Sequence, residues 1–320
     1  MIGPKRVVFW VLLAGASVAA ALGLSGCSHE TDPWPPGKPR VLATFPPLYC
    51  FTRNIAPDAA VLCMIEQEGP HGREFKSRDV LLLREADLFV ANGLGLDEHF
   101  TRRMRNSSGN HKLVFIEAGE GVPENQLREV KEIVHGDHTH TGFDPHVWLG
   151  PPQAREMVRY LAEKMAKADP EHAEQYRRNA KDYAKQLDEL EDYGKKAFAN
   201  KKNRKFATEH DSMYYFARAF GLTVAFTIQD TPGGEVPSVR LSELTKKMLD
   251  EDVHVIAVEP QYGQSSADAL INSRSLAAKR PTKVTLDPLE TFNPDDGELD
   301  AGWYVRKMRQ NIDTLAKALK

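Results

Sequence analysis

The feature that most constrains the fold is the recurrence of short apolar and β-branched runs, separated by segments long enough to form helices. The runs fall into two sets of four, one before and one after the middle of the chain. This alternation is typical of parallel sheets with helical crossovers. We therefore predict an α/β fold with two lobes, each a mostly parallel four-stranded sheet flanked by helices. The runs occupy residues 40–45, 61–66, 88–92 and 113–117, and then 205–209, 223–228, 254–259 and 282–286.

One long helix is predicted between the two sets. Asp169 is a good N-cap, and Pro170 suits the first helical position. We interpret residues 169–200 as a rigid helix that joins the lobes and exposes a charged face to solvent. A coiled-coil partner helix is the alternative, although the apolar stripe covers too few heptads to require one. The stripe consists of Tyr176, Ala180, Tyr183, Leu187 and Leu190.

The first residues are typical of an export signal. Lys5 and Arg6 precede an uncharged apolar run at 7–24, and small residues then lead to Cys27. This pattern resembles the bacterial lipoprotein signal, in which cleavage before the cysteine leaves an acylated terminus. An uncleaved transmembrane anchor is the alternative. We expect Cys27 to be lipidated and the chain to be exported and anchored to the cell membrane or its periplasmic face.

The predicted domains follow from these boundaries. A Pro-rich segment after the cysteine resists helix formation and is interpreted as a tether. The 320 residues, with 41% hydrophobic and 27% charged content, suit two domains better than one. The chain thus divides into a signal peptide at 1–26, a tether at 27–38, an N-terminal lobe at 39–168, a linking helix at 169–200 and a C-terminal lobe at 201–320.

Charge and cysteine content exclude several classes of function. A formal charge of −3 gives little support to sequence-independent binding of nucleic acid. Cys50 and Cys63 can form one disulfide or remain two thiols, and neither has a nearby cysteine at the spacing of a thiolate zinc site.

Metal-ligating side chains follow several of the predicted strands. His71 lies five residues past the second strand, whereas His210 and Asp287 directly follow strands of the second set. In parallel α/β sheets, ligands bind beyond the carboxyl ends of the strands. His146 follows the fourth strand by a long loop, so this rule alone places it less firmly. Each residue also fits an ordinary turn or loop, but together they could form a four-coordinate zinc site.

Several motifs carry a family resemblance along essentially the whole mature chain. They resemble the metal-specific solute-binding lipoproteins of bacterial ABC importers, the zinc and manganese group. The motifs are residues 43–49, Pro70-His71 with Phe75 and Asp79, residues 86–88 and 92–96, Asp144-Pro145-His146-Val147-Trp148, His210-Asp211-Ser212 with Tyr215-Phe216, and residues 284–289.

The resemblance implies metal ligands at His71, His146, His210 and Asp287 and a permease of the ABC type as partner. In this family the third position is His in zinc binders and Glu in manganese binders, so His210 favours Zn²⁺ over Mn²⁺ or Fe²⁺. Glu259, at the end of the seventh predicted strand, is either an alternate or supporting carboxylate or a surface acid.

Two departures from the family pattern concern the surroundings of these ligands. Residues 72–78 replace a segment that contains Pro and Thr in relatives, and Gly150 stands where relatives carry an acidic residue. The shape of the loop that carries His71 is therefore left open.

Three further histidines cluster in residues 129–141, which show no sustained helical or strand periodicity. The segment resembles the mobile His-rich loop of zinc-type relatives. We hypothesise that His135, His138 and His140 gather zinc weakly for the main site; a solvated polar loop is the alternative.

We therefore expect an exported, monomeric metal-binding protein that passes its ion to an importer and is not an enzyme. A zinc hydrolase is a rival interpretation, but the chain has no His-Glu-x-x-His motif. A metal-dependent surface adhesin is a second one, because an anchored pair of lobes could present a binding face.

Overall fold

The computed structural model describes residues 34–71, 73–135, 138–277 and 279–320, and the side chains of 131–141 are not among the described ones. Residues 36–320 form one compact unit. The predicted signal peptide, Cys27 and most of the predicted tether lie outside the described residues. In the described part of the chain, no helix combines the length and apolarity that crossing a membrane requires.

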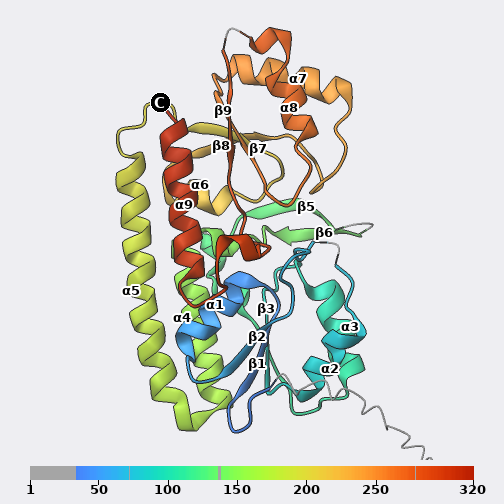
Figure 1. Ribbon diagram of the computed structural model, residues 1–320, viewed down its shortest axis with the longest axis vertical. Helices are drawn as coiled ribbons and strands as arrows, with labels where there is room; N and C mark the ends of the chain where they lie inside the picture. Colours follow the sequence, from blue (N-terminus) through green and yellow to red (C-terminus); the bar gives the residue numbers. More distant parts are fainter. Residues whose placement is uncertain (1–33, 72, 136–137, 278) are drawn as a thin grey trace, which may run out of the picture. The chain divides into compact units, whose positions relative to one another are not determined.

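The first sheet contains the four strands predicted in the first half of the chain. Its order is β2-β1-β3-β4, with all neighbours parallel (Figure 1). The crossovers contain helices α1 (Pro46–Ile55), α2 (Ser77–Glu85) and α3 (Glu98–Ser108). The strands are β1 (Arg40–Ala43), β2 (Ala60–Cys63), β3 (Leu88–Ala91) and β4 (Val114–Glu117).

The second sheet repeats this plan with the four remaining predicted strands. Its order is β10-β9-β7-β8, again parallel throughout. Helices α6 (Tyr214–Ala219), α7 (Ser238–Asp250) and α8 (Ser265–Ile271) lie between its strands in sequence. The predicted fold class of two four-stranded parallel sheets with flanking helices is confirmed. The strands are β7 (Lys205–Thr208), β8 (Thr223–Thr227), β9 (Val255–Val258) and β10 (Thr282–Thr285).

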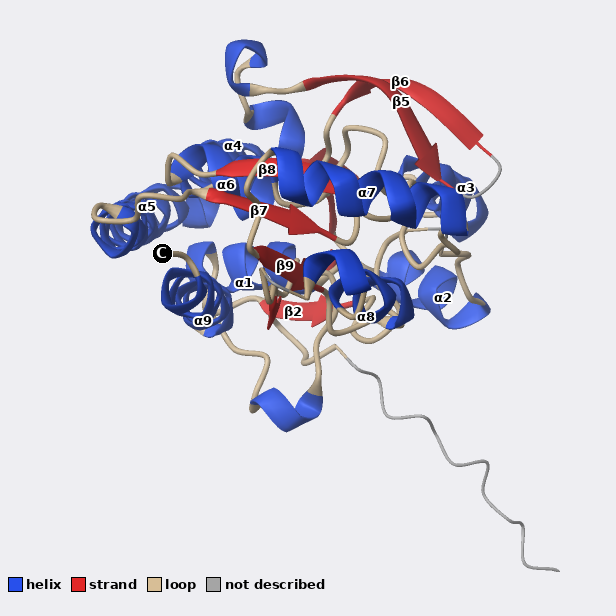
Figure 2. Cartoon of the chain, turned by 90° about the horizontal axis from the view of Figure 1, so that it is seen from above, coloured by secondary structure: helices blue, strands red, loops and turns tan. Residues whose placement is uncertain are grey.

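Three long helices lie together on one side of the sheets (Figures 1 and 2): α4 (Pro151–Ala168), α5 (Ala173–Phe198) and α9 (Trp303–Ala318). The long central helix is confirmed, but it begins later than its sequence signals indicate, because residues Pro170–His172 form a 3₁₀ turn. Asp169 holds this turn, since its carboxylate contacts Nδ1 of His172 at 2.8 Å and accepts a hydrogen bond from the Tyr176 hydroxyl. The predicted apolar stripe of α5 is buried, and the helix contacts both α4 and α9.

The histidine-containing segment is a hairpin, so the prediction of an irregular loop is wrong. Strands β5 (Glu129–His135) and β6 (His138–Phe143) run antiparallel, side by side in both views (Figures 1 and 2). The register shifts between Val130 and Ile133. Such a bulge inserts a residue and breaks the alternation by which a strand is detected in sequence.

Short 3₁₀ segments complete the described regular structure. One of them, Val147–Leu149, directly follows His146 and leads into α4. The others are Ala118–Gly121, Glu124–Gln126, Arg274–Leu276 and Pro294–Asp296.

Candidate metal centre

Four side chains from both halves of the chain bring metal-ligating atoms together. His71, His146, His210 and Glu290 each offer one atom, and these atoms all lie within 4.8 Å of one another. Oε1 of Glu290 lies 3.0 Å from Nε2 of His71, 3.6 Å from that of His146 and 3.8 Å from that of His210. The Nε2 atoms of His71 and His146 are 3.2 Å apart. The three imidazoles therefore turn the same ring nitrogen toward one carboxylate oxygen.

The parallel sheets explain why these residues meet. His71 lies in the loop that follows β2, and His210 lies two residues past the end of β7. Glu290 lies in the loop that follows β10, while His146 follows β6 and starts a 3₁₀ turn. The loops at the carboxyl ends of parallel strands form the binding crevice of such sheets. His71 and His210 therefore lie in loops that follow strands, where the sequence placed them, and the structure brings His146 to them; metal binding by these residues stays a prediction.

Asp144 fixes the orientation of His146. One oxygen, Oδ1, lies 2.8 Å from Nδ1 of His146 and accepts its backbone N–H at 3.0 Å. The other, Oδ2, is 3.2 Å from the guanidinium of Arg128. Burial disfavours the charged imidazole, but the contacts with Asp144 and Glu290 outweigh burial and raise the pKa of His146 to about 10. Because Asp144 occupies Nδ1, Nε2 is the nitrogen that faces the cluster.

Glu259 contacts Nδ1 of His210, as Asp144 contacts Nδ1 of His146. Its Oε1 atom lies 2.5 Å from Nδ1 of His210, on the side of the ring away from the cluster. Burial lowers the pKa of His210, but the negative charge of Glu259 more than compensates and raises it. Glu209 holds Glu259 in turn by accepting its backbone N–H at 2.7 Å. Of the two roles considered for Glu259, this position fits a carboxylate that supports a ligand, because a carboxylate partner commonly orients a metal-ligating histidine.

The remaining two members of the cluster are deeply buried. Glu290 is fully buried, and only 11% of the His71 side chain is exposed. Burial lowers the pKa of His71, which favours its neutral form. For Glu290 burial acts in the opposite sense, but its contacts with the histidines hold its pKa well below the usual range. The centre therefore presents an ionised carboxylate among imidazoles.

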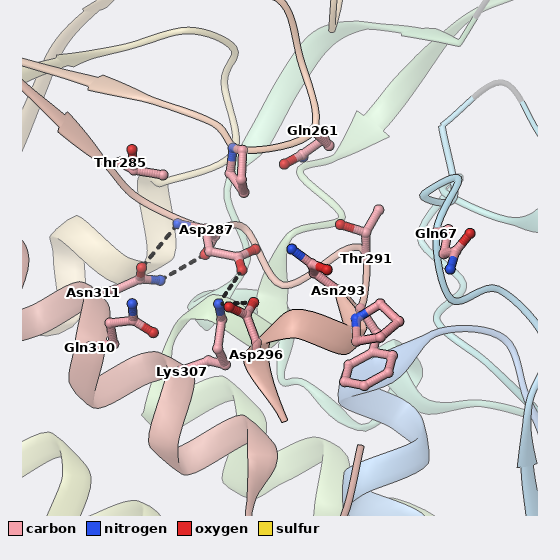
Figure 3. Close-up of a pocket in the computed structure, with 13 residues that line it drawn as sticks. Gln67, Gln261, Thr285, Asp287, Thr291, Asn293, Asp296, Lys307, Gln310 and Asn311 are labelled. Carbon is pink, nitrogen blue, oxygen red and sulfur yellow. Dashed lines mark hydrogen bonds and ion pairs between the residues drawn. The ribbon is translucent and has the colours of Figure 1, made fainter. Parts of the chain in front are cut away.

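Asp287, the fourth ligand expected from the sequence, lies outside this group. Its Oδ2 atom pairs with Nζ of Lys307 at 2.9 Å (Figure 3). Its Oδ1 atom accepts the backbone N–H of Leu289 at 2.7 Å. Asn311 binds the backbone of Asp287 from α9 through two hydrogen bonds. These contacts turn the Asp287 carboxylate toward α9, and the structure places Glu290 beside the histidines instead.

A local turn explains why Glu290, and not Asp287, lies beside the histidines. Leu289 adopts a positive φ of 63°, which bends the chain immediately before Glu290. The Asp-Pro dipeptide at Asp287 is a turn signal, and its side chain does cap the turn. In the sequence, that signal and a second acid three residues later make Glu290 a candidate ligand beside Asp287, without deciding between the two.

The other residues singled out in the sequence are the three histidines of the hairpin and the two cysteines downstream of Cys27. The backbone pairs His135 with His138 and Ile133 with His140, whereas the side chains of these histidines lie outside the described ones. Cys50 and Cys63 are free thiols, and each Sγ contacts a backbone carbonyl, of Asp300 and Ile65 respectively.

Charged side chains hold the loop that carries His71, and they include residues of the segment 72–78 that departs from the family pattern. Arg73, buried to 8% exposure, bridges Asp79 at 2.9 Å and Glu68. His99 contacts the backbone carbonyl of Arg73 at 2.9 Å. The altered segment therefore still fixes the chain close to His71.

Known proteins share this architecture. The chain is 29% identical to the high-affinity zinc uptake system protein ZnuA of Bacillus subtilis over 97% of its own length and 96% of that protein. The zinc-binding lipoprotein AdcA of Streptococcus pneumoniae is 28% identical over 92% of the chain, which spans only 58% of AdcA.

Solved structures agree with these relatives. The Zn(II)-bound ZnuA-like domain of Streptococcus pneumoniae AdcA matches with a TM-score of 0.70 and 25% identity, over 88% of this chain and 99% of that domain. The solute-binding protein FpvC of Pseudomonas aeruginosa, in complex with Mn²⁺, matches with a TM-score of 0.75 and 27% identity, over 88% and 98% of the two chains. The family model described as zinc-uptake complex component A, periplasmic, matches residues 41–318. This chain therefore belongs to the ZnuA family of periplasmic zinc-uptake components.

Proposed function

We propose that this protein captures one zinc ion with His71, His146, His210 and Glu290 and delivers it to an ABC-type importer in the membrane. The observation that carries the proposal is the convergence of three Nε2 atoms on one buried carboxylate oxygen. Donors bonded to a tetrahedral zinc ion at about 2.0–2.1 Å lie about 3.3 Å from one another. The distances of 3.0–3.8 Å to Oε1 of Glu290 require only small shifts to reach this geometry.

Binding without catalysis follows from the number of ligands. A catalytic zinc site keeps one position for water or substrate, whereas four protein ligands close a tetrahedral shell. Burial of His146, His210 and Glu290 further limits the access of a substrate to the ion. A hydrolase is therefore disfavoured, in agreement with the transport role of the family.

The donor set favours zinc over manganese. Imidazole suits zinc, while manganese prefers carboxylate, carbonyl and water oxygens. The centre offers three imidazoles and one carboxylate. The names of the relatives ZnuA and AdcA support the same metal, although FpvC is described in complex with Mn²⁺.

Export and anchoring through Cys27 belong to the same proposal. The lipoprotein-like pattern that ends at Cys27 supports it, as does the lipoprotein name of AdcA. A lipid anchor and a tether at 27–38 would keep a monomeric binding protein close to its permease. Cys27→Ser should move the protein from the membrane fraction to the soluble fraction, and an unchanged distribution would count against the anchor.

Metal analysis tests the proposed function directly. The purified protein should retain one zinc ion per chain in competition with manganese and iron, because imidazoles select against oxygen-preferring manganese and Zn²⁺ binds such donors more tightly than Fe²⁺. His210→Ala should lose this retention. A wild-type protein that keeps manganese, or a variant that keeps zinc as firmly as the wild type, would contradict the proposal.

A further inference from the structure

Gln261 lies where it can hold two carboxylates of the metal centre at once. It follows β9 by three residues, and its Nε2 atom lies 3.1 Å from Oε2 of Glu259 and 3.4 Å from Oε2 of Glu290. The other oxygen of each carboxylate contacts a histidine: Oε1 of Glu259 contacts His210, and Oε1 of Glu290 contacts His71. One amide group therefore connects the carboxylate that orients a ligand to the carboxylate that is a ligand.

The chemistry of the side chain suits this position. A carboxamide NH₂ group has two hydrogens, and an ionised carboxylate only accepts hydrogen bonds. The NH₂ group of Gln261 can thus donate one hydrogen to each acid and reduce the repulsion between two anions in a buried place. The reverse orientation of the amide would point its oxygen at two carboxylate oxygens, so the contacts themselves assign Nε2 to this side.

Gln261 also belongs to the lining of a pocket. It lines a pocket of about 420 Å³, and Figure 3 shows it on the side of the pocket away from α9. Most of the residues around the pocket carry polar side chains, so water can occupy it. These residues include Gln67, Thr285, Thr291, Asn293, Gln310 and Asn311. Gln261 thus contacts the fully buried Glu290 through its amide and also lines this pocket.

We propose that Gln261 is a positioning residue that sets zinc retention by donating hydrogen bonds to Glu259 and Glu290 together. This inference rests on the proposed function, since it concerns the same ion. The amide keeps Oε1 of each acid turned toward its histidine, so the ligand atoms stay close to their metal-binding positions before the ion arrives. Supporting partners of this kind typically change metal affinity by about 10- to 100-fold.

Two substitutions separate hydrogen bonding from the filling of space. Gln261→Met keeps a side chain of similar length but cannot donate, so both Oε2 atoms lose this partner. Gln261→Ala opens space toward the pocket, where water can enter and donate to the carboxylates instead. If hydrogen bonding is the function of Gln261, Gln261→Met should weaken zinc binding more than Gln261→Ala does. If the side chain only fills space, Gln261→Ala should bind zinc more weakly, and Gln261→Met should bind it like the wild type.

The experiment measures zinc affinity by competition with a chromophoric chelator, together with the absorption spectrum of the Co²⁺-loaded protein. We expect Gln261→Met to bind zinc about 10- to 100-fold more weakly than wild type, with Gln261→Ala between the two. The intensity of the Co²⁺ bands should also change, because it reports the geometry of the ligands. Gln310→Met makes the same replacement on the α9 side of the pocket and should match wild type in both measurements.

The possible results decide between the inference and the proposed function. The inference is overturned if both Gln261 variants bind zinc as tightly as the wild type. It is also overturned if Gln261→Met has wild-type affinity while Gln261→Ala binds more weakly. Either result leaves the proposed function intact. A wild-type chain that binds no zinc would instead overturn the proposed function. If Gln261→Met fails to fold by circular dichroism, Gln261→Leu, which also cannot donate a hydrogen bond, takes its place: zinc binding weaker than in Gln261→Ala supports the inference, and wild-type binding overturns it.

Discussion

At the scale of single residues, the direction in which a side chain faces decides whether it can bind the ion. Asp287 and Glu290 are three residues apart and both buried, yet only Glu290 lies among the histidines. The sequence indicated the histidines because each follows a predicted strand or is part of a family motif. It could not indicate which acid turns inward, since that depends on the turn at Leu289 and on the partners Lys307 and Asn311 in α9.

The two acids give a direct test at this scale. Glu290→Gln should bind zinc more than 100-fold more weakly, because loss of a charged ligand exceeds the loss of a supporting partner, which is about 10- to 100-fold. Asp287→Asn keeps an oxygen that can accept from Leu289 N–H and should still retain one zinc ion. Both affinities can be measured by chelator competition. Strong loss in Asp287→Asn with retention in Glu290→Gln would restore Asp287 as the ligand.

Protonation of the histidines makes zinc binding depend on pH. The pKa of His146 is raised to about 10, so this ring is positively charged at neutral pH in the metal-free protein, and the pKa of His210 is also raised. Zinc binds only the unprotonated Nε2, so binding must release protons, and affinity should increase as the pH rises from 6 toward 9. Calorimetry in buffers of different ionisation enthalpy measures the number released.

Asp144 supplies the matched variant for that measurement. Asp144→Asn removes the charge that helps to hold the proton on His146. It should therefore release about one proton fewer at neutral pH, even though it also orients the ring less firmly. An unchanged proton count in this variant would show that Asp144 does not set the charge of His146.

At the scale of elements, the sequence predicted all eight strands of the two sheets and the long helix. These elements show clear periodicity over their length, and packing agrees with it. The β5–β6 hairpin was missed because the irregular register between Val130 and Ile133 interrupts the alternation of its strands. The start of α5 was misplaced because a 3₁₀ turn uses the same Asp-Pro signal as a helix N-terminus.

The hairpin is coupled to the metal centre at its base. Arg128, which immediately precedes β5, contacts Asp144 at 3.2 Å and Asp211 at 2.9 Å, and Asp144 holds His146. The Tyr215 hydroxyl also joins the base, since it accepts from the backbone N–H of Arg128 and donates to the carbonyl of Asp144.

Breaking the Arg128 contacts should loosen His146. A lysine cannot reproduce the fork of a guanidinium that reaches two carboxylates, so Arg128→Lys should release zinc about 10-fold faster. Arg218→Lys is a suitable control, because Arg218 lines a second pocket together with Arg128 but donates to the backbone carbonyl of Gln126. Release can be followed after mixing the zinc-loaded protein with excess chelator. Equal rates in the two variants would contradict a role for Arg128 at the centre.

At the scale of the whole molecule, metal-ligating side chains that follow strands of both sheets meet at one site. His71 follows a strand of the first sheet, whereas His210 and Glu290 follow strands of the second. An ion bound by all of them must stabilise the folded chain, since the unfolded chain does not hold these groups together.

Removal of the metal should therefore lower thermal stability. At free zinc about 1,000 times the dissociation constant, binding contributes about 4 kcal/mol to the free energy of unfolding. Calorimetric scans of zinc-loaded and chelator-treated protein should show a lower midpoint for the metal-free form. The His210→Ala variant should show little difference between the two conditions. A midpoint of the wild-type protein that does not respond to zinc would contradict an ion shared by the two sheets.

The central claim is that three imidazoles and the Glu290 carboxylate bind zinc, and X-ray absorption at the zinc edge of the loaded protein tests it most directly. Four nitrogen or oxygen neighbours at about 2.0–2.1 Å, with outer-shell scattering from three imidazole rings, are the predicted result. A shell that contains sulfur, or a six-coordinate shell with scattering from fewer than three imidazole rings, would contradict the account.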